Sequence, residues 1–157
     1  MPDLDVSNSS IPTDEVFFDT AEAAPGYRLS RMNAETIRRV MDLIEPIYDP
    51  VYGGGSSLPW LTRSELVIGI ESENGAYAYP VRVLNIHEIV NDVIDGQPVL
   101  VTYCPLCGSG VVYRRELGGE PLLFGNSSGL YQSELVGDGV VVDEVGVASV
   151  VIFSLDL

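Results

Sequence analysis

The spacing of apolar residues changes along the chain, and this change bears directly on the fold class. Residues 33–46, "NAETIRRVMDLIEP", carry apolar side chains at positions i, i+3, i+4 and i+7, which predicts an amphipathic helix. Asn33 suits its N-cap, and Pro46 ends it. The apolar stripe of this helix consists of Ile37, Val40, Met41 and Ile44.

From Glu65 onward the apolar runs are short and separated by turn residues, which predicts strands. The first two strands are expected over 66–72 and 76–81, joined by an Asn-Gly hairpin turn. Three more are expected over 97–103, 110–117 and 120–125.

Residues 82–94, "RVLNIHEIVNDVI", interrupt the strands with apolar residues at helical spacing. This spacing predicts a short helix that carries the segment HEIVND and ends at Gly96. The sequence as a whole therefore predicts an α+β fold. It would contain antiparallel β-hairpins, one N-terminal amphipathic helix and the short HEIVND helix.

The domain organisation follows from the same pass along the chain. Residues 1–32 are an irregular, acidic lead-in with three prolines, and residues 33–136 form the α+β domain. Residues 137–157 are a Val-rich tail, predicted to form one or two strands or a poorly ordered segment. A chain of 157 residues is long enough for one domain with a hydrophobic core.

Charge excludes several classes of partner. The 23 acidic residues outnumber 8 basic ones, all of them Arg, so the net charge is −15. The electrostatic field of so negative a chain repels nucleic acids and anionic lipids, so no nucleic-acid partner is expected. An acidic chain without Lys is typical of a halophilic protein, although an ordinary acidic protein is the alternative.

No membrane-spanning run or secretory signal is visible, and the chain as given is expected to be cytoplasmic.

The candidate chemistry centres on Cys104 and Cys107 in "VTYCPLCGSGVVY". Two thiols at this spacing could bind a metal, form a redox dithiol or simply be buried. A thioredoxin-type site needs a helix after the first cysteine, but here two glycines and β-branched residues follow. A strand, a CPLCG turn and a second strand are instead typical of a metal knuckle.

Two thiolates are half of a tetrahedral site, so further ligands are needed. His87, the sole histidine, is the first candidate, and Asp92 is a candidate carboxylate ligand. Such a set suits a zinc or copper ion and could leave a position open for catalysis. Glu88 is then the candidate acid or base, and Asn91 the residue that orients the imidazole or a bound molecule. HEIVND lacks the second histidine of a metalloprotease motif.

Two other functions remain open at this point. One is a thiol-disulfide oxidoreductase that uses the CPLC pair, with His87 or Glu88 as the proton acceptor. The other is a non-catalytic binding or structural domain. Whether the chain is an enzyme stays undecided, and its partner is an unknown small molecule.

Residues 66–113 also carry a resemblance to a known family. "AYP", "HEIVND" and "TYCPLCGSGVVY" stand in the order and spacing of the domain-of-unknown-function family numbered 3179, and "FGNSSGLYQSELV" is similar to its later part. The resemblance spans residues 5–136, and "DPVYGGGSSLPWL" resembles members from halophilic archaea. It implies that HEIVND and CPLC belong to one signature and a shared site. Members of the family are often exported or lipid-anchored.

The resemblance breaks after Val136. Family members continue there with a "MYDRxTxSxW"-like segment, which residues 137–157 do not resemble. One hypothesis is that this is a frameshifted or truncated member. Translation of the other reading frames of the coding DNA tests it, since one of them should then contain "YDR" and a Trp.

Overall fold

The structure is a computed structural model that describes residues 12, 14–18, 27–31, 35–36, 43–54, 58–106, 108–131, 134–142 and 148–154. Strands dominate these residues, and one short helix is defined from end to end. The elements are β1 (Phe17–Phe18), β2 (Tyr27–Arg28), the 3-10 turn η2 (Leu29–Arg31), β3 (Ile47–Tyr48), β4 (Val67–Ser72), β5 (Gly75–Pro80), α2 (Val81–His87), β6 (Ile89–Ile94), β7 (Gln97–Cys104), β8 (Ser109–Arg114), β9 (Glu116–Leu117), β10 (Glu120–Tyr131), β11 (Glu134–Val142) and β12 (Ala148–Ser154).

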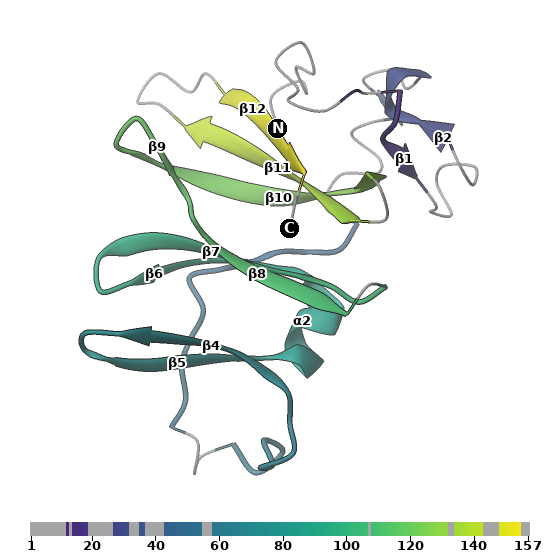
Figure 1. Cartoon of the computed structure of the whole chain (residues 1–157). Coiled ribbons are helices and arrows are strands. Elements are labelled where there is room, and N and C mark those ends of the chain that lie inside the picture. Colours follow the sequence, from purple (N-terminus) through teal and green to yellow (C-terminus); the bar gives the residue numbers. More distant parts are fainter. Residues whose placement is uncertain are drawn as a thin grey trace.

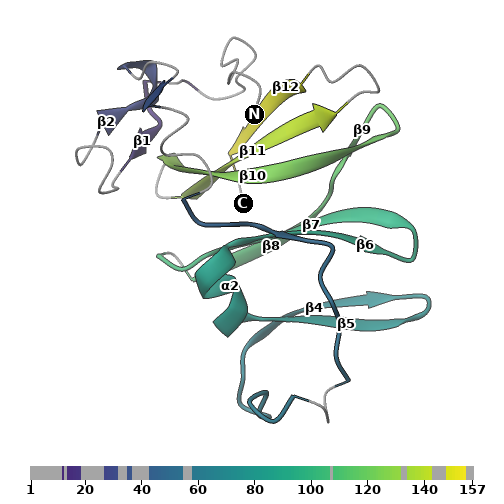
Figure 2. The same cartoon turned by 180° about the vertical axis from the view of Figure 1, so that it is seen from behind.

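The strands form three stacked layers (Figures 1 and 2). The middle layer is a four-stranded sheet in the order β3-β6-β7-β8, in which β3 and β6 are parallel and the other pairs are antiparallel. One outer layer is the β4–β5 hairpin. The other is the sheet β12-β11-β10-β1-β2, with β9 paired to β10. α2 lies at one end of the stack, between the hairpin and the middle sheet (Figure 1).

Each side of the middle sheet has its own hydrophobic core. Toward the hairpin and α2, the buried cluster consists of Tyr79, Leu84, Val90, Ile94, Val99 and Val101. Toward β10, the buried cluster consists of Ile89, Leu100, Cys104, Leu122 and Phe124. Successive residues of β6 and β7 therefore alternate between two cores, and both strands are covered on both faces.

This double coverage corrects the prediction for HEIVND. The predicted helix over residues 82–94 is wrong in its second half, because α2 ends at His87 and residues 89–94 form β6. A strand buried on both faces shows no alternation of apolar and polar residues, so Val90 and Ile94 coincided with a helical period. The β-branched residues of "IVNDVI" favour the strand instead.

The predicted α+β class is also wrong, since the described part is mostly β with one short helix. The predicted N-terminal helix, with Ile37, Val40 and Met41, lies largely outside the described residues. The predicted strands at 66–72, 76–81 and 97–103 correspond closely to β4, β5 and β7. In the Val-rich tail, β11 continues past residue 137 and pairs with β12.

Helix α2 has seven residues. In the described part of the chain, no helix is long and apolar enough to cross a membrane.

Candidate functional site

The junction between α2 and β6 places His87 and Glu88 at one end of the middle sheet. The Glu88 N–H donates to the Leu84 carbonyl at 2.8 Å, as in the last turn of a helix. Glu88 itself has φ 59° and ψ −31°, a positive-φ conformation outside the left-handed helical region, and it turns the chain sharply into β6. Its carbonyl then accepts the Tyr103 N–H at 2.8 Å, which fixes the junction to β7.

The end of β7 brings Cys104 to the same end of the sheet, because β6 and β7 are antiparallel. Cys104 is 3% exposed and packs in the core toward β10. It pairs with Ser109, and the Gly108 N–H donates to the Cys104 carbonyl at 2.8 Å. Gly108 has φ 64°, a conformation that glycine adopts without strain. A tight turn between two strands therefore carries the CPLC motif, as the sequence predicted, while Cys107 lies outside the described residues.

The His87 ring is anchored through one nitrogen. Nδ1 lies 2.8 Å from the Glu45 carbonyl oxygen. A carbonyl oxygen only accepts hydrogen bonds, so Nδ1 donates in this contact and Nε2 is left for another partner. The ring also lines an open cavity of about 260 Å³ beside α2.

The Glu88 side chain points toward the β10 layer. Asn126 donates from Nδ2 to Glu88 Oε2 at 2.8 Å, and Asn126 is fully buried. Burial raises the pKa of the Glu88 carboxyl above its ordinary value, while the hydrogen bond from Asn126 opposes this shift. Glu88 is thus a half-buried carboxyl held by a rigid donor.

Asn91 joins β6 to β10. Its Nδ2 donates to the Phe124 carbonyl and its Oδ1 accepts the Phe124 N–H, both at 2.8 Å. The side-chain amide therefore pairs with β10 as a neighbouring strand would. The structure places Asn91 in contact with Phe124, whereas its predicted role was to orient His87 or a bound molecule.

Asp92 faces the other way, toward the β4–β5 hairpin. Its Oδ2 accepts hydrogen bonds from the hydroxyls of Tyr52 and Tyr79, and its Oδ1 accepts the Val93 N–H at 2.6 Å. Burial, with a further contribution from the hydrogen bond to Asp92, raises the pKa of both tyrosine hydroxyls. Adjacent residues of a strand point to opposite faces, so Asp92 lies on the hairpin side of the middle sheet, away from the Cys104 core.

Residues 41–137 match a known protein family, described as "Protein of unknown function (DUF3179)". This match spans more than half of the chain. The chain belongs to this family. The predicted resemblance began at residue 5 and ended at 136, so its end agrees with the match and its start does not. No curated protein and no solved structure shows significant similarity to the chain.

In this member of the DUF3179 family, three of the segments that carry the resemblance lie close together. HEIVND contacts "FGNSSG" directly, through Glu88 with Asn126 and Asn91 with Phe124. CPLC joins them through Cys104, which packs in the same core as Phe124. Among the described residues, no group of three His, Cys, Asp or Glu side chains is arranged to hold a metal ion.

Several buried polar residues of this region escaped the sequence analysis. Arg115 is 6% exposed and donates to the Asp92 carbonyl at 3.1 Å and to the Leu122 carbonyl at 2.7 Å. Tyr79 and Asn126 were missed in the same way. Such residues lie far from their partners in the sequence, so no local spacing reveals them. The one usable signal was the likeness of "FGNSSG" to the family.

Proposed function

We propose that this protein binds a single zinc or copper ion at the end of the middle sheet, through Cys104, Cys107 and His87, with one coordination position open for a substrate. Glu88 is the proposed acid or base at that position. The observation that carries the proposal is the junction of the CPLC turn with the end of α2, joined by the hydrogen bond from Tyr103 N–H to the Glu88 carbonyl.

The turn supports the two thiolate ligands. Cys104 ends a strand and Ser109, its pairing partner, begins the next one, so a turn of four residues separates them. Knuckles that hold tetrahedral metals carry their two cysteines on a turn of this kind between two strands. The proposal requires Cys107 as a ligand, because no three candidate ligands come together among the described residues.

His87 supports the third ligand. Metal-binding histidines commonly donate one ring N–H to a carbonyl or carboxylate, which fixes the ring and leaves the other nitrogen for the metal. The hydrogen bond from Nδ1 to the Glu45 carbonyl has this arrangement. The ring is only partly buried, so a bound ion would be accessible from solvent.

Asp92 is left out of this ligand set, although its residue type suggested it. Its carboxylate is already engaged by two tyrosine hydroxyls and a backbone N–H on the hairpin side. Metal binding there would have to compete with these donors at a buried position. Glu88, on the β10 side, is the carboxyl nearest in sequence to His87 and is held by Asn126.

Metal analysis of the protein purified without added metal tests the proposal. We expect about one zinc or copper ion per chain, because thiolate and imidazole ligands together bind these ions tightly. Cys107→Ser should remove the ion, and His87→Gln should weaken its binding. Asp92→Asn is the matched control and should retain it.

Three outcomes would contradict the metal site. They are protein without metal, Cys107→Ser that retains the ion, and Asp92→Asn that loses it while still folded by circular dichroism. Two titratable thiols that form a reversible disulfide would instead favour thiol-disulfide exchange. The turn into β8 counts against that chemistry, since no helix begins at the cysteines to stabilise a thiolate.

A further inference from the structure

A cavity beside α2 offers a binding site for a small molecule. It measures about 260 Å³ and is lined by Trp60, Arg82, Val83, Ile86 and His87. The ring of Trp60 forms an apolar wall with Val83 and Ile86, and Arg82 and His87 are the polar side chains. Few convergent polar groups against an apolar wall are characteristic of small-molecule sites, and this volume lies just below their usual range of about 300–1,000 Å³.

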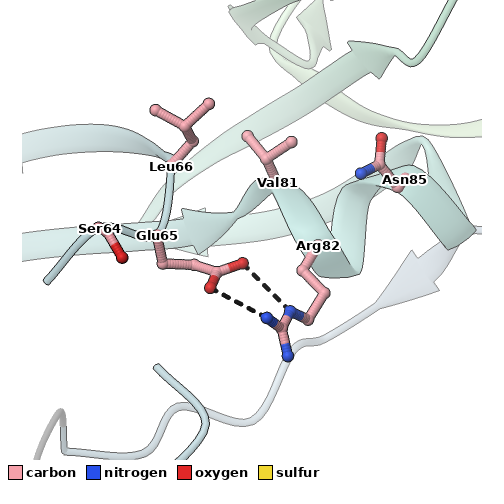
Figure 3. Close-up of a pocket in the computed structure, with 6 residues that line it drawn as sticks. All are labelled: Ser64, Glu65, Leu66, Val81, Arg82 and Asn85. Carbon is pink, nitrogen blue, oxygen red and sulfur yellow. Dashed lines mark hydrogen bonds and ion pairs between the residues drawn. The ribbon is translucent and has the colours of Figure 1, made fainter. Parts of the chain in front are cut away.

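Arg82 supplies the charge of this cavity. Its Nε and Nη2 bind the two carboxylate oxygens of Glu65 at 3.1 and 3.2 Å, as the dashed lines in Figure 3 show for a second pocket that Arg82 also lines. This bidentate pair fixes the plane of the guanidinium group. The same group lies 6.0 Å from the centre of the Trp60 ring, a cation–π contact.

The guanidinium group of Arg82 keeps N–H donors that Glu65 does not bind. Within the described part of the chain, Nη1 takes part in no hydrogen bond, and the Arg82 side chain is 60% exposed. The other polar side chain, His87, has its Nδ1 engaged by the Glu45 carbonyl oxygen. Arg82, which lines the cavity, can therefore offer a ligand there an N–H donor and a positive charge.

We propose that this cavity binds a small organic carboxylate, with its carboxylate on Arg82 and its apolar body against Trp60, Val83 and Ile86. The inference deepens the proposed function, because His87 would belong to both the metal site and the cavity. The cavity would then select the substrate class that reaches the open metal position. Glu65 offsets part of the positive charge, so we expect millimolar affinity.

Trp60 is the single tryptophan of the chain, so its fluorescence reports on this cavity directly. Three probes of one shape differ only in their polar end, namely 3-methylbutanoate, 3-methylbutanamide and 3-methylbutylamine. None of them absorbs at the wavelengths of Trp excitation or emission. We expect a saturable change with 3-methylbutanoate, about tenfold weaker binding of the amide, and no response to the amine at fixed ionic strength.

Two variants locate the binding. Arg82→Gln should weaken 3-methylbutanoate binding at least about tenfold, since it removes the charge-assisted hydrogen bond. Ile86→Glu should abolish binding by placing a negative charge in the cavity, and Ile86 is 66% exposed, so folding tolerates the change. Arg114→Gln, an exposed arginine on β8, is the matched control and should bind as the unaltered protein does.

Equal binding of the carboxylate and the amide would overturn the inference, as would an unaltered affinity in Arg82→Gln. No saturable response up to about 100 mM would do so as well. The metal content of each protein is measured alongside. If the protein binds 3-methylbutanoate but contains no metal, the metal site is refuted and the cavity is not. If it contains metal but does not bind 3-methylbutanoate, the cavity is refuted and the metal site is not.

Discussion

At the scale of single residues, Asn91 is the residue on which the contact between two layers depends most directly. Asn91→Ala removes two hydrogen bonds with the backbone of β10, in a place where water cannot replace them. Each buried polar group left without its partner costs about 1–3 kcal/mol, so we expect a loss of about 2–4 kcal/mol in the free energy of unfolding. Denaturant unfolding at equilibrium measures it.

Asn85→Ala is the matched control, because Asn85 lies exposed on α2. Its free energy of unfolding should stay within about 0.5 kcal/mol of the original. A loss below about 1 kcal/mol in Asn91→Ala would show that the two layers are not held together through this amide.

At the scale of elements, the strands bounded by clear turns could be predicted and the placement of the site could not. β4, β5 and β7 follow from local runs of apolar residues bounded by turns, a signal that needs no tertiary information. β6 was misread because its two faces enter two different cores, which erases the alternation. The CPLC turn was predicted from its glycines, whereas the contact between Glu88 and Asn126 depends on a pairing across 38 positions.

The packing of the hairpin on the middle sheet is tight at one point. A Cβ atom on Gly110 would lie 2.4 Å from Ile68 Cδ1 and 3.1 Å from the Thr102 carbonyl oxygen. Ile68 Cδ1 is the end of a flexible side chain and can move aside, so Gly110→Ala should disturb the packing of Ile68 against β8 and cost about 1 kcal/mol of stability. Unfolding in denaturant measures the loss.

Gly69→Ala is the control for this substitution. Gly69 lies in β4 with no atom within 4 Å of the added Cβ, and its φ needs no glycine. Alanine there should be neutral or stabilise by up to about 1 kcal/mol, because it restricts the unfolded chain. Equal effects of the two substitutions would mean that the close approach of Ile68 does not limit packing.

At the scale of the whole molecule, a net charge of −15 on 157 residues opposes the folded state. Compact folding brings these like charges together, and salt screens them over a Debye length that falls from about 10 Å at 0.1 M to about 3 Å at 1 M. We therefore expect the midpoint of thermal unfolding to rise steadily with KCl concentration up to molar levels.

A variant with fewer charges separates screening from the general effect of salt on hydrophobic burial. Glu71, Glu73 and Glu120 are exposed, so their joint replacement by Gln removes three negative charges without disturbing either core. This variant should be more stable at low salt and show a shallower rise with KCl, since less repulsion remains to be screened. If the midpoint of thermal unfolding rises with KCl equally steeply in both proteins, the rise is caused by stronger hydrophobic burial instead of by screening. The acidic composition would then be a matter of solubility and not of stability.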